Sequence, residues 1–213
     1  MNNRGTGAGG NQTNINGKNF ENKTDNKVNN NPLVMFYTQH GLNKYLKVTY
    51  KLLHFRNPDE AYIISNIGEK PILIILEKKN QNSNGSVEDK LWAGPSFKRE
   101  YELTLGHIFN IQYIFCISSF LKTKLTSSLQ KYTVLNIILK ENNIEVLFGD
   151  DKDYFEKLNE IISSYLIQED NNEVKDNNEV RKCNYIFIKG KRKGLKCSVL
   201  PKHGLLCSKH VIK

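Results

Sequence analysis

The stretch Pro71-Ile-Leu-Ile-Ile-Leu-Glu77-Lys-Lys79 is a run of apolar residues that ends abruptly in three charged ones. A short apolar, β-branched run of this kind predicts a strand that is buried on both faces of a sheet. Because side chains alternate along a strand, Glu77 and Lys79 are expected to point to the same face. The strand therefore brings a carboxylate and an ammonium to the edge of the core.

A second carboxylate is expected beside them. The sequence Asn57-Pro-Asp59 leads into Ala61-Tyr-Ile-Ile64, which also reads as a strand, so Asp59 is expected to meet Glu77. Two adjacent carboxylates repel each other unless a divalent cation neutralises them, and hard oxygen ligands suit Mg²⁺. Lys79 would position the attacking water or help to deprotonate it. The set predicts metal-assisted phosphodiester hydrolysis, with Asp59 and Glu77 as the magnesium ligands.

Other interpretations of these motifs stay open or fail on context. A charged pair after a buried strand is often only the solvated exit of that strand. The isolated His40, His54 and His107 are interpreted as surface or packing residues rather than catalysts. The pattern Gly5-x-Gly7-x-x-Gly10 fits a dinucleotide fingerprint, but no strand can precede residue 5.

The rest of the central region alternates between helical and strand patterns. Helices are expected from about 16 to 21, from Ser86 to 92, and over 97–105, 121–140 and 151–166; strands are expected over 112–118 and 144–148. The last helix should bury one face, formed by Tyr154, Phe155, Leu158, Ile161, Ile162 and Tyr165. Residues 33–55 have no firm assignment, and Cys116 is expected to be a small buried apolar residue. The pattern predicts an α/β core.

Composition divides the chain into four parts. Residues 1–15 are rich in Gly and Asn and are expected to be a flexible arm, either contacting DNA or simply disordered. The core is expected over 16–168. Residues 169–181 repeat Asp-Asn-Asn-Glu-Val and predict a polar linker, which leaves a small basic module at 182–213.

The formal net charge of +9 is concentrated at the C-terminal end. Residues 181–213 contain ten Lys and Arg and no acidic residue, so the rest of the chain has 21 basic and 22 acidic residues. Positive charge at one end is typical of proteins that bind a polyanion, although a solubilising tail has the same composition.

Cysteines in the same segment predict a zinc site. Three thiolates and one imidazole complete a tetrahedral Zn²⁺ set, and His203 is an alternative ligand. The expected ligands are Cys183, Cys197, Cys207 and His210. About thirty residues cannot fold on apolar burial alone, so the metal would replace a core. The alternative is free thiols in a disordered tail.

A β-hairpin is expected between the first two of these cysteines. Its tip would present four basic side chains to phosphates: Lys189, Lys191, Arg192 and Lys193. We therefore expect the module to act as a DNA clamp. No window approaches 18 apolar residues and no signal peptide is visible, so an intracellular location is expected.

Pro58-Asp59 followed by Glu77-x-Lys79 matches the motif of the PD-(D/E)XK nucleases. The longer string Glu77-Lys-Lys79-Asn-Gln81, with Gly85-Ser86 opening the next helix, resembles a subset of type II restriction endonucleases, and the similarity spans most of residues 4–165. The resemblance implies a restriction-endonuclease-like fold, a mixed central sheet flanked by helices, with a small β-rich zinc module attached.

The same resemblance implies an activity. It implies a Mg²⁺-dependent endonuclease that cuts double-stranded DNA at a specific sequence, often as a homodimer on a palindromic site. It adds Gln81 to the catalytic residues, and Glu21 on the first helix in an outer or second-metal role.

Two departures from the motif leave alternatives open. Lys78 replaces a small or apolar residue, and Glu60 next to Asp59 competes for the metal role. A structure-specific repair or recombination nuclease, and a non-catalytic DNA-binding protein on a decayed nuclease fold, remain alternative functions.

Overall fold

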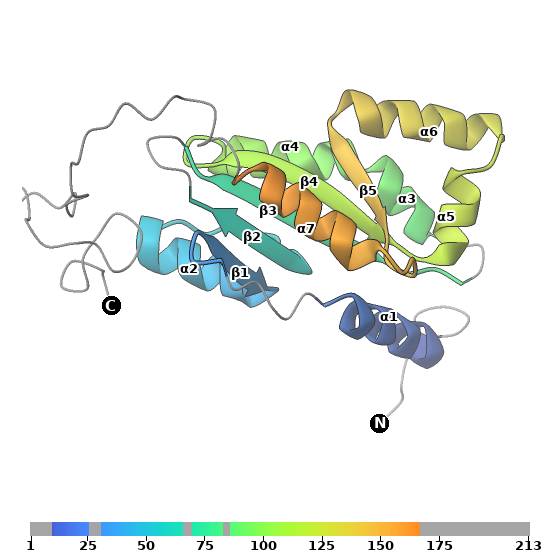
Figure 1. The fold of residues 1–213 in the computed structure, drawn as a ribbon, viewed down its shortest axis with the longest axis horizontal. Coiled ribbons are helices and arrows are strands. Elements are labelled where there is room, and N and C mark those ends of the chain that lie inside the picture. Colours follow the sequence, from blue (N-terminus) through green and yellow to red (C-terminus); the bar gives the residue numbers. More distant parts are fainter. Residues whose placement is uncertain (1–9, 26–30, 66–69, 83–85, 167–213) are drawn as a thin grey trace, which may run out of the picture.

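The computed structural model describes residues 10–25, 31–65, 70–82 and 86–166. Within these ranges the chain forms seven helices and five strands (Figure 1). In chain order they are α1 (Gly10–Thr24), β1 (Val34–Thr38), α2 (His40–Tyr50), β2 (Glu60–Ile64), β3 (Ile72–Lys79), α3 (Val87–Trp92), α4 (Gly94–Leu105), β4 (Asn110–Ile117), α5 (Ser119–Leu125), α6 (Gln130–Glu141), β5 (Ile144–Phe148) and α7 (Tyr154–Ser164).

The five strands form one mixed sheet in the order β1-β2-β3-β4-β5. The pairs β1–β2 and β2–β3 are antiparallel, whereas β3–β4 and β4–β5 are parallel. Parallel neighbours need a crossover, and α3 with α4 supplies the one between β3 and β4. The predicted α/β class with a mixed sheet is confirmed.

Helices cover both faces of this sheet. Leu73 and Ile75 of β3 belong to a core that includes residues of α2, α3, α4, α5 and α6. Ile74 and Leu76 point to the other face, where the core includes Phe20 of α1 and three residues of α7. Figure 1 shows α7 in front of the sheet and α4 behind it. The strand is therefore buried on both faces, as its apolar run predicts.

Two segments differ from expectation because tertiary contacts decide them. The unassigned residues 33–55 include β1 and α2, and α2 ends at Tyr50; the C-cap residue Lys51 has a left-handed φ of 60°, and its N–H donates to the Leu46 carbonyl. The single helix expected over 121–140 is divided after α5. The Asn136 side chain donates 2.7 Å to the Leu125 carbonyl, which satisfies a carbonyl that the break exposes.

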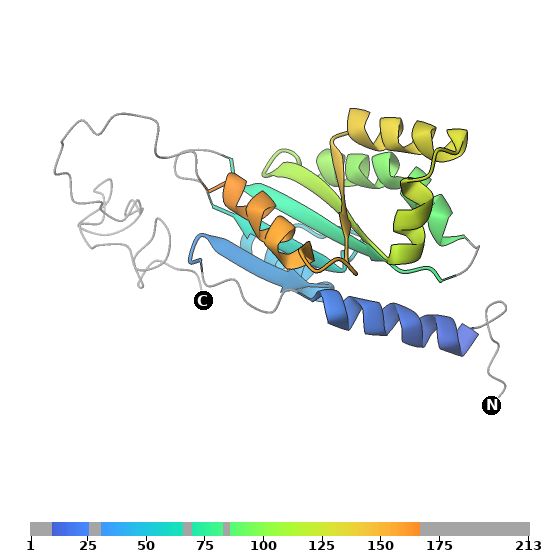
Figure 2. The ribbon, with the colours of Figure 1, turned by 45° about the vertical axis from the view of Figure 1, so that its right-hand side comes forward.

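The first helix begins earlier than expected, because α1 starts at Gly10 and not near residue 16. Phe20 and Thr24 are buried at its C-terminal end, and the Asn16 carbonyl accepts 2.8 Å from the Asn80 side chain. A helix anchored in this way propagates towards its start at little further cost, even through Asn and Gly. Figure 2 shows α1 alongside one end of the sheet.

The position of Phe155 also differs from the prediction. It was expected on the buried face of α7 but is 41% exposed, whereas Tyr154, Leu158 and Ile162 are buried. These three follow i, i+4 and i+8, so the buried stripe is narrower than expected and Phe155 lies outside it. Cys116 is buried, as predicted.

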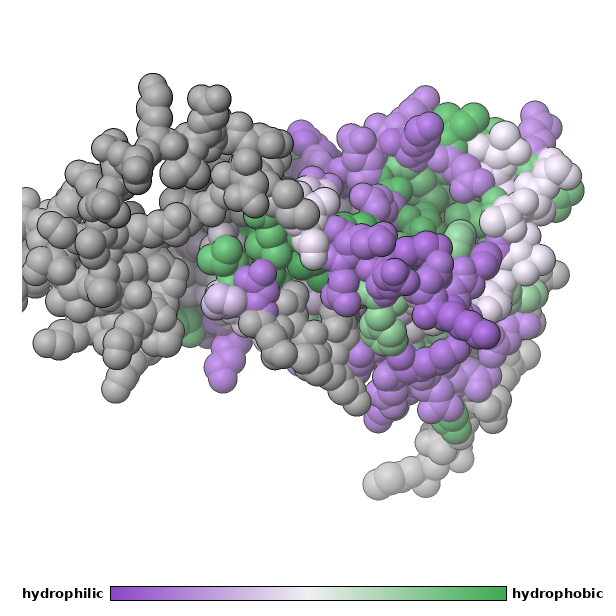
Figure 3. All heavy atoms as spheres, in the orientation of Figure 1, coloured by the Kyte–Doolittle hydropathy of each residue, from purple (hydrophilic) through white to green (hydrophobic). Residues whose placement is uncertain are grey.

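The face towards the viewer in Figure 3 is largely hydrophilic over α7.

Among the helices in the described ranges, none has the length and apolar character needed to cross a bilayer.

Candidate active site

The β2–β3 register places Asp59 beside Glu77. Glu60 pairs with Leu76 in the antiparallel ladder, so the residue before Glu60 lies opposite the residue after Leu76. The Asp59 carboxylate accepts the backbone N–H of Lys78 at 2.7 Å, which fixes it against the end of β3. The predicted meeting of the two carboxylates thus follows from strand pairing.

Lys79 completes the cluster on the same face. Its Nζ lies 2.6 Å from Glu77 Oε2, 3.5 Å from Asp59 Oδ2 and 3.1 Å from the Lys78 carbonyl oxygen. Glu77 and Lys79 therefore lie on the same face of β3, as their spacing of two residues predicts. Three oxygens converge on one positive charge at this end of the sheet.

Burial makes these charges sensitive to one another. It raises the pKa of Glu77 above its usual range; Lys79 opposes this rise and Asp59 adds to it. Burial alone lowers the pKa of Lys79, but the carboxylates of Glu77 and Asp59 outweigh it, so that the pKa is above its ordinary value. Lys79 is thus held as an ammonium, and the two carboxylates are stabilised by a cation between them.

A metal ion would find a suitable set of ligands here. In the part of the chain that the structure describes, no group of three or more His, Cys, Asp and Glu side chains could hold a metal by itself. The oxygens around Lys79 are two carboxylates and one backbone carbonyl. Such an all-oxygen set matches the preference of Mg²⁺, which keeps several waters and takes only a few protein ligands.

Glu60 is directed away from this cluster. It alternates to the other face of the sheet, where it is fully buried, accepts 2.8 Å from Lys78 Nζ and accepts 2.6 Å from the Tyr62 hydroxyl. The two departures from the nuclease motif thus explain each other. The unusual Lys78 neutralises the unusual Glu60.

Glu21 reaches the same end of the sheet from α1. Burial raises the pKa of its carboxyl, and the negative charge of Asp59 raises it further, while Lys78 and Lys79 oppose the rise. The Glu21 backbone carbonyl accepts 3.0 Å from Lys78 Nζ. Glu21 is therefore close enough to interact electrostatically with Asp59, but it is tied to the sheet through its backbone.

Gln81 links two strand ends. Its N–H donates to Ser118 Oγ at 3.2 Å, and the Ser118 hydroxyl donates to the Gln81 carbonyl at 3.0 Å. These contacts join the segment after β3 to the end of β4, and the Gln81 side chain is buried.

Sequence reasoning missed three residues beside the cluster. Arg56 forms a two-bond pair with the Glu100 carboxylate, one bond at 3.0 Å, and its guanidinium lies 4.3 Å from the Phe97 ring centroid. Burial raises the pKa of Tyr101 and of Tyr113, and Glu77 is the next cause in both. Of these three, only Arg56 lies near the motif in the sequence, three residues before Asp59.

The histidines behave as expected. His54 is buried and stacks on Tyr101, with ring centroids 4.1 Å apart, and its Nδ1 lies 2.9 Å from Thr104 Oγ1. His40 and His107 are exposed.

The cluster lies at the end of the sheet where β2 begins and β3 ends. A cavity of about 420 Å³ lies at the other end of the sheet, lined by Lys98, Gln112, Asn143, Ile144 and Tyr165 among others. The side chains of Asp59, Glu77 and Lys79 are 22%, 15% and 12% exposed. A site at the edge of a sheet suits a large substrate better than a small enclosed one.

The predicted zinc ligands, Cys183, Cys197, Cys207 and His210, lie outside the described residues, as do Lys189, Lys191, Arg192 and Lys193. Comparisons with protein-family models, with curated proteins and with solved structures gave no match.

Proposed function

We propose that this chain is a Mg²⁺-dependent DNA endonuclease of the PD-(D/E)XK type. The observation that carries the proposal is the convergence of Asp59, Glu77 and Lys79 on one face at adjoining strand ends, with Lys79 Nζ 2.6 Å from Glu77 and 3.5 Å from Asp59. A solvated strand exit does not require a partly buried ammonium between two carboxylates. The mixed sheet, with the motif on its antiparallel β2–β3 pair, is compatible with a restriction-endonuclease-like core.

Asp59, Glu77 and the Lys78 carbonyl would hold the magnesium ion. When bound, Mg²⁺ supplies positive charge to the scissile phosphate and activates water for attack. The Lys78 N–H keeps the Asp59 carboxylate in place, and the pairing of β2 with β3 fixes its distance from Glu77. This rigid support is what a preorganised site needs.

Lys79 would act on the nucleophile and on the phosphate. Its ammonium donates hydrogen bonds and stabilises negative charge that develops on the phosphate oxygens. The carboxylates of Glu77 and Asp59 raise the pKa of Lys79, so its side chain acts in this scheme as a positively charged hydrogen-bond donor. Glu21 has an outer role in this scheme, and Gln81 supports the strand end.

The finer parts of the proposal rest on the sequence. They are recognition of a specific palindromic duplex, action as a homodimer, and a C-terminal zinc module that clamps DNA through its basic hairpin. A structure-specific nuclease would use the same three residues on nicked or branched DNA.

Cleavage of unmethylated plasmid and phage DNA tests the proposal. Discrete fragments should appear in Mg²⁺ and disappear with EDTA or in Lys79→Ala, whereas Lys140→Ala, an exposed lysine on α6, should cut normally. Cutting only at nicks or branches would favour the structure-specific alternative. Intact DNA that is nevertheless bound in Mg²⁺ would overturn the nuclease assignment in favour of the binding-protein alternative.

A further inference from the structure

The chain between Asp25 and Asp59 contains no acidic residue. In the described part of this stretch, the basic residues other than histidine are Lys44, Lys47, Lys51 and Arg56, and the next charged residue is Asp59 of the candidate site. Arg56 is neutralised by Glu100, which leaves the three lysines on α2 and at its end. We call these three residues the α2 lysines.

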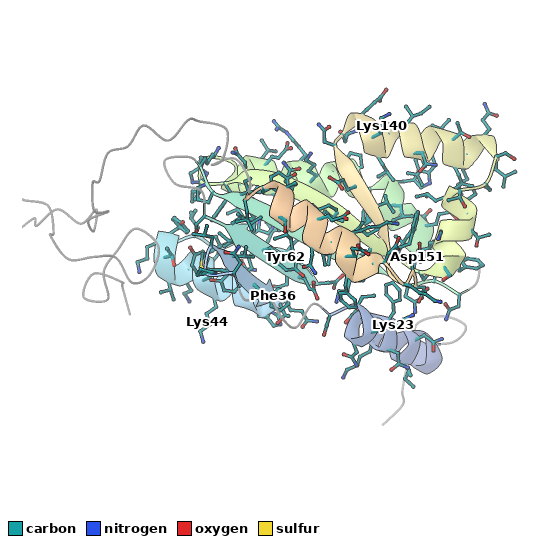
Figure 4. The ribbon with its side chains drawn as sticks, viewed as in Figure 1. Lys23, Phe36, Lys44, Tyr62, Lys140 and Asp151 are labelled. Carbon is teal, nitrogen blue, oxygen red and sulfur yellow. The ribbon has the colours of Figure 1, made fainter. Side chains whose placement is uncertain are left out.

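The α2 lysines form one exposed stripe. Leu42 and Leu46 are fully buried against the sheet, whereas Lys44, Lys47 and Lys51 are exposed. Lys44 and Lys47, three residues apart, lie on the same face of α2, opposite the buried leucines, and Lys51 follows the helix as its C-cap residue. In Figure 4, Lys44 points away from the sheet.

These charges are less compensated than those of most other lysines. Many described lysines lie in ion pairs: Lys23, Lys78, Lys79, Lys98, Lys122, Lys124, Lys131 and Lys157. Lys44 and Lys47 have no ion-pair partner among the described residues, and Lys51 Nζ donates only to the Val48 carbonyl, at 3.0 Å. An uncompensated basic stripe attracts phosphate.

The stripe also lies on the side of the sheet that carries the candidate site. Leu42 and Leu46 share a core with Leu73 and Ile75, which lie on the same face of β3 as Glu77 and Lys79. At the start of α2, the Gln39 N–H donates to the Asp59 carbonyl at 3.4 Å. On the other face, α7 carries Glu156 and Glu160, and its Lys157 is paired with Asp153.

We propose that the α2 lysines bind the phosphate backbone of the duplex whose cleavage the candidate site would perform. The inference rests on the proposed function and names the surface of the core that holds the substrate. The helix rise of about 1.5 Å per residue separates Lys44 from Lys51 by about 10 Å. One DNA strand carries one phosphate about every 3.4 Å along the duplex axis, so this length spans about three phosphates of a strand. The contacts carry charge but no sequence information, so the stripe orients DNA across Asp59, Glu77 and Lys79.

Salt-dependent binding of a fluorescent duplex by the full chain in EDTA tests the inference without cleavage. The double variant Lys44→Ala/Lys47→Ala should bind about tenfold more weakly at low salt, and the slope of log affinity against log salt should fall by about 1.8. Because alanine is the best helix former, α2 should persist, and the thermal unfolding curve checks this. The basic C-terminal stretch is present in every variant, so the difference isolates α2.

Two controls separate charge from folding. Lys140→Ala/Lys157→Ala removes the same charge from α6 and α7, away from α2, and should leave the slope unchanged. Lys44→Arg/Lys47→Arg keeps the charge and should keep the slope. Wild-type affinity and slope in the alanine variant, or an equal loss in the α6 and α7 control, would overturn the inference. Weakened binding in a protein that cuts no substrate would sink the nuclease proposal and leave the phosphate surface standing.

Discussion

Lys78 and Glu60 form an ion pair in the interior of the protein, with Lys78 Nζ 2.8 Å from Glu60 Oε1 and side-chain exposures of 1% and 0%. The pair lies on the opposite face of β3 from Lys79 and Glu77. Lys78 also contacts Asp25, and Glu60 also accepts from Tyr62. Charges this deeply buried are tolerated only when they are paired and hydrogen-bonded.

Removing one partner of this pair should be costly. Lys78→Met leaves the Glu60 carboxylate buried without its cation, and we expect a loss of about 3 to 5 kcal/mol in the free energy of unfolding. The double variant Lys78→Met/Glu60→Gln should recover part of this loss because no unpaired charge remains. Urea unfolding of the two singles and the double measures the coupling. Strictly additive losses would contradict the pairing.

Asp59 and Glu60 are neighbours in the sequence, but only the substitution of Asp59 is expected to impair cleavage. Asp59→Asn should lower the cleavage rate by about a thousandfold, equivalent to about 4 kcal/mol, because the site loses a charged ligand oxygen. Glu60→Gln should retain cleavage under conditions where it is folded, because Glu60 faces Lys78 and Tyr62. Single-turnover rates over a range of Mg²⁺ concentrations compare the two. Loss of cleavage in folded Glu60→Gln together with wild-type cleavage in Asp59→Asn would reverse the assignment.

The parts of the site that lie on regular strands could be predicted from sequence. Alternation places Glu77 and Lys79 together, and Pro58-Asp59, separated from the apolar run 61–64 by Glu60 alone, places a carboxylate at the start of the neighbouring strand. Both conclusions need only a period of two and antiparallel pairing. The same alternation assigns Lys78 and Glu60 to the other face, but their partnership depends on a register that sequence does not reveal.

The remaining features depend on contacts between distant segments. Tyr101 comes from α4 and reaches the surroundings of Glu77 only through the packing of that helix on the sheet. The early start of α1 depends on Phe20 and Asn80, which are sixty residues apart in the chain. Propensity cannot anticipate such contacts, and it favours a loop where Asn and Gly predominate.

Tyr101 offers a test of the interior beside the site. Its hydroxyl is buried and has no hydrogen-bond partner among the residues that the structure describes. A buried hydroxyl without a partner costs about 1 to 3 kcal/mol, so Tyr101→Phe should leave stability unchanged or raise it. Thermal and urea unfolding measure this, with Tyr132→Phe as the control, because Tyr132 donates 2.9 Å to Glu88 and should lose about 1 to 2 kcal/mol. A clear loss of stability in Tyr101→Phe would reveal a partner for the hydroxyl.

Zinc content tests the C-terminal proposal. If Cys183, Cys197, Cys207 and His210 hold one ion, the purified chain should contain about one zinc per molecule. Cys197→Ser should lose it and bind DNA more weakly, because the module folds with its metal. Cys116→Ala is the matched control, since this thiol is buried in the core and should leave zinc content unchanged. A zinc-free wild-type chain purified from zinc-supplemented medium would contradict the module.

Glu88 should control the acid stability of the core. Burial alone raises the pKa of its carboxyl, but hydrogen bonds from Lys131, Lys124 and Tyr132 outweigh this and lower the pKa to about 2. The unfolded chain takes up a proton near pH 4.3, so the stabilisation by ionised Glu88 is complete above that pH. It is then lost as the pH falls towards 2.

Glu88→Gln removes this stabilisation. The contacts of the Glu88 carboxylate with Lys124, Lys131 and Tyr132 link α3 to α5 and α6. The loss at pH 7 should be about 1 to 2 kcal/mol, because the Glu88 carboxylate loses its hydrogen bonds and ion pairs, and solvent screens the pair with Lys131, whose side chain is 56% exposed. Between pH 5 and about 2, the variant should lose less stability than the wild type, since it has no proton to take up at this position. Urea unfolding at pH 7, 4 and 3 measures both effects, with Glu141→Gln as the exposed control on α6. Parallel pH profiles for Glu88→Gln and wild type would mean that the carboxylate does not contribute through its charge.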